Sequence, residues 1–104
     1  MKAFSDPSTE AKYLSLGFVP EGPSLKLSVG NASVFATEHP WKGAVLVLES
    51  FSPRTMTQYG IACPTKCSAQ QIAGLIYINI AQNFRDSKAA WKAHFDDLGM
   101  ALFQ

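Results

Sequence analysis

Residues 63–84, CPTKCSAQQIAGLIYINIAQNF, contain the helix around which we expect the rest of the chain to fold. Ser68 is followed three residues later by Gln71, which is the capping-box pattern: each side chain can bond the backbone amide of the other residue. The helix is therefore expected to begin at Ser68. Its apolar residues form one stripe at helical spacing, made up of Ala73, Ile76, Tyr77, Ile80 and Phe84.

Three further apolar residues of this helix, Ile72, Leu75 and Ile78, lie outside that stripe. One face of a sheet covers one side of a helix, so these residues need a second cover. The chain's own last helix could supply it, or a second chain could. We expect the helix to lie at a subunit or partner interface, with a homodimer as the simplest arrangement. Asn79 either fixes the register of that contact or belongs to a narrow wet face, which the pattern favours.

The composition is that of a folded protein of one domain, residues 1–104. Of the 104 residues, 47% are hydrophobic and 16% are charged, which is below the ~25% typical of soluble domains. A surface with few charges favours self-association. The formal net charge is only +1, so the chain has no basic field for phosphates, and nucleic acid is not an expected partner.

The compartment predicted from the sequence is the cytoplasm. The first ten residues, MKAFSDPSTE, contain no apolar core of a signal peptide, and no apolar run approaches the ~20 residues that span a bilayer. No membrane association is therefore expected. The two cysteines are expected to be reduced in such a compartment.

The order of the predicted elements indicates an α+β fold: a short N-terminal helix, a four-stranded, mainly antiparallel sheet and two C-terminal helices packed on it. Asp6 and Pro7 begin a helix that ends near Leu16, and Pro20–Pro23 predicts a turn. The run at 44–48 is apolar at every position, so its strand should lie inside the sheet and be covered on both faces. The remaining strands are predicted at 25–29, 32–37 and 56–63, with a two-residue turn at Gly30-Asn31. The last helix is expected to begin after a cap at Asp86 or Ser87. Its apolar stripe consists of Trp91, Phe95, Leu98 and Leu102.

Cys63 and Cys67 are the candidates for thiol chemistry, because a strand-to-helix junction stabilises a thiolate. Their C-x-x-x-C spacing differs from that of the thioredoxin-like redox motif, so the pattern favours structural roles for both. Together with His39 and His94, the only histidines, they would make a Cys₂His₂ set suited to zinc. The two histidines lie far apart in the sequence, and we expect no metal or other cofactor.

Trp41 lies in a Pro-containing connection, where it either binds a partner or folds back over the sheet. No acid, base and nucleophile can be combined from the spacing, so the sequence favours a small non-catalytic protein that binds protein, including its own copy. The alternative is a protein with an apolar pocket between sheet and helices that holds a small apolar ligand. A thiol-dependent enzyme centred on Cys63 is the third interpretation.

Overall fold

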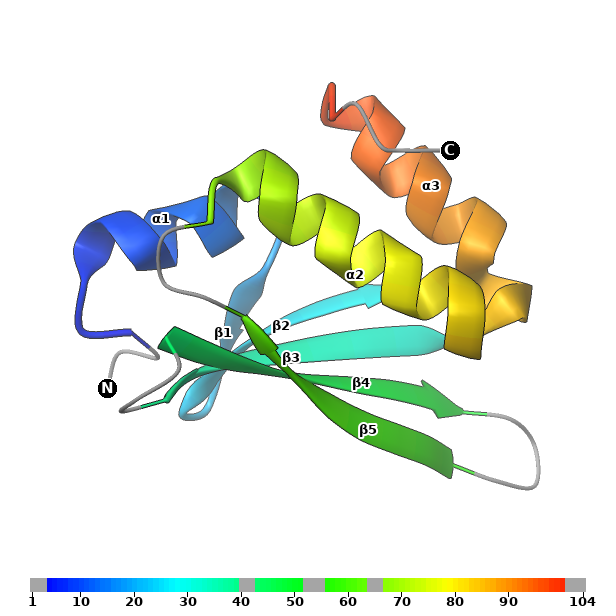
Figure 1. The fold of residues 1–104 in the computed structure, drawn as a ribbon, viewed down its shortest axis with the longest axis horizontal. Coiled ribbons are helices and arrows are strands. Elements are labelled where there is room, and N and C mark those ends of the chain that lie inside the picture. Colours follow the sequence, from blue (N-terminus) through cyan, green and yellow to red (C-terminus); the bar gives the residue numbers. More distant parts are fainter. Residues whose placement is uncertain (1–3, 40–42, 52–55, 64–66, 101–104) are drawn as a thin grey trace.

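A computed structural model describes residues 4–39, 43–51, 56–63 and 67–100 (Figure 1). The predicted α+β fold is confirmed: a short N-terminal helix precedes an antiparallel sheet that contains the four predicted strands, and two helices follow. The elements in chain order are α1 (Pro7–Ser15), β1 (Val19–Glu21), β2 (Ser24–Val29), β3 (Ala32–His39), β4 (Gly43–Phe51), β5 (Met56–Cys63), α2 (Ala69–Asn83), a 3₁₀ turn (Arg85–Ser87) and α3 (Lys88–Asp97).

Each strand of the sheet pairs antiparallel with the next one in sequence, in the order β1-β2-β3-β4-β5. The strand β4 therefore lies between β3 and β5, as its apolar sequence predicts. The turn between β2 and β3 also forms as predicted. Val29 pairs with Ala32, and Gly30 supplies the positive φ of 60° that this two-residue connection requires.

The strand β1 is an addition to the prediction. Its residues pair with β2 from Val19↔Lys26 to Glu21↔Ser24, in a region where the sequence indicates only a turn. The strand has three residues, too few for a period-two pattern to show. Pro20, at its centre, lacks an amide hydrogen, and proline is tolerated in a sheet mainly at its edge.

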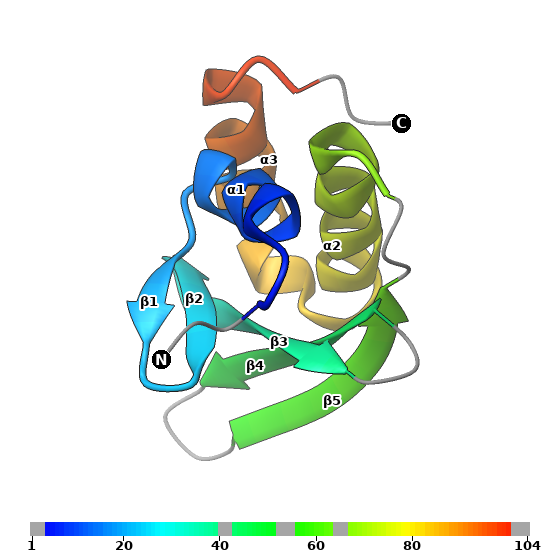
Figure 2. The ribbon, with the colours of Figure 1, turned by 90° about the vertical axis from the view of Figure 1, so that its left-hand side faces the viewer.

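All three helices cover the same face of the sheet (Figure 2). In β4 the residues that face them are excluded from solvent, with Leu46 and Leu48 at 0% exposure, whereas Val45 and Val47 on the other face are only half-buried. The expectation that β4 is covered on both faces is therefore wrong. An all-apolar strand sequence does not distinguish two covers from one cover and a half-exposed face.

The helix α2 supplies much of the core. Its predicted stripe is confirmed, since Ala73, Ile76, Tyr77, Ile80 and Phe84 are all buried. In α3, Trp91 and Phe95 are fully buried, but Leu98 is 40% exposed because α3 ends at Asp97; Leu102 lies outside the described residues. Within the described ranges, no helix is long and apolar enough to cross a bilayer.

The predicted N-terminal caps of α2 and α3 differ in outcome. At α2 the capping box is complete: the Ser68 amide donates to Gln71 Oε1 at 2.8 Å, and the Gln71 amide donates to Ser68 Oγ at 3.1 Å. At α3 Ser87 occupies the cap position, as one of the two predicted residues, but its side chain makes no hydrogen bond to the helix. The 3₁₀ turn Arg85–Ser87 leads directly into α3 instead.

Exchange of backbone amides tests the position of β4. The amides of Val45, Leu46 and Val47 are expected to exchange with solvent among the slowest in the chain, because β4 is hydrogen-bonded on both sides and lies over the core. Hydrogen exchange followed by NMR measures this directly. Exchange at these three amides as fast as in β1 would contradict the strand order.

The cap of α1 makes stability depend on pH. Asp6 accepts hydrogen bonds from the Ser8 amide at 3.1 Å and from Thr9 Oγ1 at 3.0 Å, and these bonds, with the amide bond the larger cause, lower the pKa of Asp6. A lowered folded-state pKa gives stability that is present above the ordinary pKa of about 4 and is lost as pH falls through the folded value.

The variant Asp6→Ala is therefore expected to unfold at a lower temperature than the wild type at neutral pH, and the gap should narrow as the pH drops below about 4. Thermal unfolding at a series of pH values measures the gap. Asp97→Ala, which removes an exposed carboxylate at the end of α3, is the control. A gap for Asp6→Ala that stays constant down to acid pH would show that the charge of Asp6 has no part in the cap.

Candidate interaction surface

A second stripe on α2 faces away from the core. It consists of Leu75, Ile78, Asn79 and Gln82, which follow one another at i, i+3, i+4 and i+7 and so share one side of the helix. Ile78 is 44% exposed and is one of four large apolar residues exposed in the described part of the chain. Leu75 and Asn79 are half-buried, and Gln82 is exposed. We call these four residues the second stripe.

Ile72 does not belong to this surface. It is 2% exposed and lies in the core cluster, so the expectation that it faces a partner is wrong. The reason is that α2 contacts α1 and α3 as well as lying over the sheet, and covers on several sides bury a wider arc than one stripe. The chain's own helices thus cover part of the apolar surface that the sequence left without a cover. Leu75 packs partly against the core, and Ile78 is left outside it.

The asparagines of α2 hydrogen-bond along their own helix. Asn79 Nδ2 donates to the Leu75 carbonyl at 2.8 Å, and Asn83 Nδ2 donates to the Asn79 carbonyl at 3.0 Å. With the exposed Gln82 they form a polar edge of the helix, which agrees with the wet-face interpretation of the sequence. Asn79 is nevertheless half-buried beside Leu75, so it borders the apolar part of the second stripe.

The segment that carries the second stripe is almost without charge. Between Arg54 and Arg85 the only charged residue is Lys66, although 16% of the whole chain is charged. This charge-poor segment, residues 55–84, comprises β5 and α2. Figure 2 shows α2 lying over the β4–β5 side of the sheet, with α3 on the β2 side. The sequence contains this signal, but it becomes informative only when the fold brings both elements to one side of the molecule.

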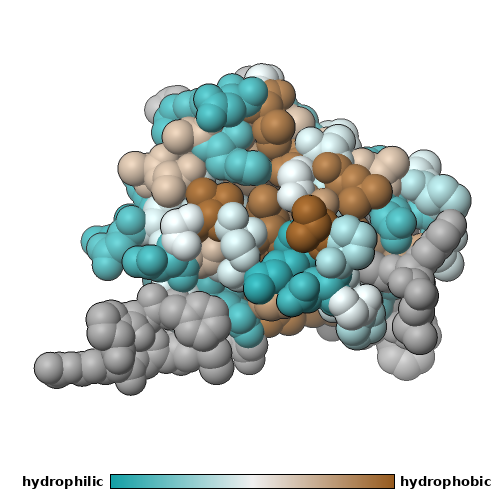
Figure 3. All heavy atoms as spheres, turned by 180° about the vertical axis from the view of Figure 1, so that it is seen from behind, coloured by the Kyte–Doolittle hydropathy of each residue, from teal (hydrophilic) through white to brown (hydrophobic). Residues whose placement is uncertain are grey.

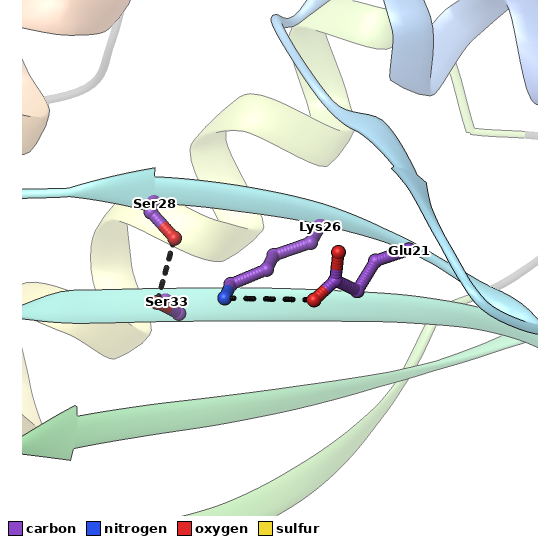
Figure 4. Close-up of polar contacts among 4 residues, drawn as sticks. All are labelled: Glu21, Lys26, Ser28 and Ser33. Carbon is purple, nitrogen blue, oxygen red and sulfur yellow. Dashed lines mark hydrogen bonds and ion pairs between the residues drawn. The ribbon is translucent and has the colours of Figure 1, made fainter.

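The face of the sheet opposite the helices is more polar than the second stripe. On it Ser28 and Ser33 share a hydrogen bond of 2.8 Å, and Lys26 pairs with Glu21 at 4.0 Å (Figure 4). The Lys26 ammonium also lies 5.3 Å from the centre of the Phe35 ring. These polar contacts, and the position of Lys26 over the Phe35 ring, make this face the weaker candidate for an apolar partner.

The remaining exposed apolar residues are distributed over other elements. They are Leu14 at the end of α1, Val19 in β1 and Leu98 after α3. Figure 3 views the molecule from behind, where apolar residues alternate with hydrophilic ones. Single exposed apolar side chains are normal on a protein surface, so these three indicate no site by themselves.

Of the two thiols, the structure describes one. Cys67 is half-buried just before the Ser68 cap, and its backbone carbonyl accepts a hydrogen bond from Lys12 Nζ at 3.0 Å. This bond ties α1 to the start of α2 through the backbone and leaves the sulfur uninvolved. Cys63 ends β5, and its side chain lies outside the described part, as does the predicted interface residue Trp41.

His94 has a structural contact. Its Nε2 lies 2.8 Å from the Leu16 carbonyl, and its ring packs beside the rings of Trp91 and Phe95, with centroids 6.4 and 5.3 Å away. The ring also lies 3.1 Å from where a Cβ on Gly17 would be. His94 therefore joins α3 to the end of α1. Among the residues whose positions are described, no three metal-binding side chains cluster, and the side chain of His39 is outside that set.

Comparison with known proteins adds no relative. No protein-family model matches the chain, and no curated protein and no solved structure matches it significantly. The described side chains include no assembled acid, base and nucleophile. The distinctive feature of the described surface is a charge-poor side with an exposed apolar residue, Ile78.

The reactivity of Cys67 can be measured apart from Cys63. In the variant Cys63→Ser, Cys67 is expected to react with iodoacetamide more slowly in the folded protein than in denaturant, because its side chain is half-buried. Mass spectrometry follows the labelling at neutral pH. Faster labelling in the folded state would instead indicate a stabilised thiolate and revive the enzyme interpretation.

Proposed function

We propose that this chain is a non-catalytic protein that acts by binding protein, and in the first place a second copy of itself, through the second stripe of α2. The observation that carries the proposal is Ile78, which is 44% exposed at the centre of a fifteen-residue helix that has no charged residue. A solvated surface helix usually carries charges on its outer face. An outer face without them suits a helix that is covered in the working state.

The apolar burial available at this surface makes a modest contribution to the free energy of binding. Fully burying an isoleucine is worth about 1.5–3 kcal/mol relative to exposure, and Ile78 has close to half of that still to gain. Leu75, half-buried beside it, adds to the same contact. Desolvating this stripe removes no charge from water, so the usual penalty for burying a charged helix face is absent.

A binding role is better supported than a pocket for an apolar ligand. The described side chains that meet between the sheet and the helices belong to one cluster of core residues, each at 7% exposure or less. Cys67 is a free thiol, which suits the reducing environment of the cytoplasm, and we place the protein there. No ion, nucleic acid or membrane is needed for the proposed activity.

Replacing Ile78 tests the proposal. Ile78→Lys puts a charge into the contact, and we expect at least about a tenfold rise in the dimer dissociation constant, equivalent to about 1.4 kcal/mol. Light scattering over a concentration series measures the mass, and circular dichroism verifies the fold. Leu75 is a poorer probe because it also packs against the core.

The control is Leu14→Lys. Like Ile78, Leu14 is a large apolar residue on the surface of a helix, and it is 43% exposed. It lies on α1, outside the charge-poor segment. This variant should remain dimeric. A wild type that is monomeric at high concentration would contradict self-association, and loss of the dimer in both variants would show that the second stripe has no special role.

A further inference from the structure

The sheet ends at β5 in the described part of the chain, and this edge is long. The strand has eight residues, Met56–Cys63, and pairs with β4 along its whole length from Phe51↔Met56 to Ala44↔Cys63. Its other side is the last position in the strand order. Along that side every second residue directs its amide and carbonyl away from β4, where an added strand would bond them.

The two edges of the sheet differ in their protection against further pairing. The opposite edge, β1, has three residues, with Pro20 at its centre and Glu21 at its end. Short length, proline and charge are the devices by which proteins block an edge. The eight residues of β5, MTQYGIAC, include neither a proline nor a charged residue. One edge is thus blocked, whereas the other has the sequence of a strand that is paired on both sides.

Gly60 lies in the middle of β5, and the described part of the chain shows no reason for a glycine there. The described glycines with a positive φ, where the backbone itself favours glycine, are Gly17, Gly22, Gly30 and Gly99. Gly60 is not among them, and the nearest described atoms to a Cβ there would be at the ordinary contact distances of 3.8 and 3.9 Å. Glycine inside a strand weakens it and often marks a place where another backbone approaches closely.

We propose that β5 pairs antiparallel with β5 of a second copy across a two-fold axis near Gly60, so that one sheet continues through both protomers. This inference rests on the proposed self-association and specifies its geometry. Because α2 lies over the β4–β5 side of the sheet, the same two-fold axis brings the α2 helices of the two protomers to the same interface (Figure 2). The second stripe and the edge of β5 then form one continuous contact.

The charge pattern favours a second copy over a different partner. An antiparallel strand pair is itself two-fold symmetric, so an edge strand is complementary to its own copy. Residues near a two-fold axis also meet their own counterparts, and any charge there would face a like charge. The charge-poor segment, with Lys66 as its only charge, avoids this repulsion over both β5 and α2.

The area is also adequate. A strand of eight residues is about 27 Å long, and one sheet layer with one helix layer is about 20 Å deep. The resulting face is about 500 Å² on each protomer, so the dimer would bury about 1,000 Å² in total, which is where specific interfaces begin. Strand pairing alone would fall short of this size, and the α2 contact supplies the rest.

Amide exchange compared between the wild type and Ile78→Lys tests the inference. In the wild-type dimer, alternate amides of residues 56–63 should exchange at least about tenfold more slowly than in the monomeric variant, because those amides gain a partner strand. The amides of β1 should not change. Light scattering on the same samples establishes which species is present.

The outcomes separate the two proposals. A dimeric wild type whose β5 amides gain no protection would overturn strand pairing and leave self-association standing. A wild type that is monomeric at high concentration would overturn both. Protection of β5 that appears in a monomer only with an added extended peptide would assign the edge to a different strand, and would also overturn pairing with a second copy.

Proline substitutions at neighbouring positions provide a second test. The amides of Thr57 and Gln58 point in opposite directions, one toward β4 and the other toward the outer edge. A proline at the position whose amide points to the outer edge removes only a bond to the partner strand, so that variant should fold and be monomeric. Of Thr57→Pro and Gln58→Pro, the other variant removes a bond to β4 and should lose stability. If the folded variant of this pair keeps the dimer, the inference is wrong.

Discussion

The packing of α2 against one face of the sheet is the contact on which the rest of this structure depends. Alternate residues of the sheet, such as Leu46 and Leu48, face the helix layer, and α2 contributes Ile76 and Ile80 to the same core. All four are at 0% exposure. The capping box at Ser68 sets where the helix begins and therefore which of its residues reach the sheet. A shift of one position would rotate the buried stripe by about 100° and direct it into solvent.

The other two helices, α1 and α3, both pack against α2. The helix α3 packs against it and against β2, and α1 contacts it while Lys12 bonds the carbonyl of Cys67 just before its first turn. His94 closes this layer through the Leu16 carbonyl. All three helices therefore lie on one face of the sheet. On the other face the side chains contact one another, as in the Ser28–Ser33 hydrogen bond and in Lys26 lying over the Phe35 ring.

The same arrangement explains why one side of the molecule is poor in charge. The segment 55–84 runs along the β5 edge and returns as α2, so a feature that is local in the sequence becomes one face in space. A monomer gains nothing from an unprotected edge strand, and natural sheets usually block such edges. If β5 pairs with a partner and β1 does not, the difference between the two edges is explained: β1 is short and contains a proline, whereas β5 has neither feature.

The sequence by itself determined the local features: the capping box at Ser68, the Gly30 turn, the order of elements and the main stripe of α2, because each depends on residues close together in the chain. It could not show β1, whose three residues are too short for a periodic signal. Only the tertiary structure decided that Ile72 is core while Ile78 is surface, since that depends on how much of α2 the sheet and the other two helices cover together. It also decided that β4 is covered by helices on one face, because a strand that is apolar at every position does not show which face the helices cover.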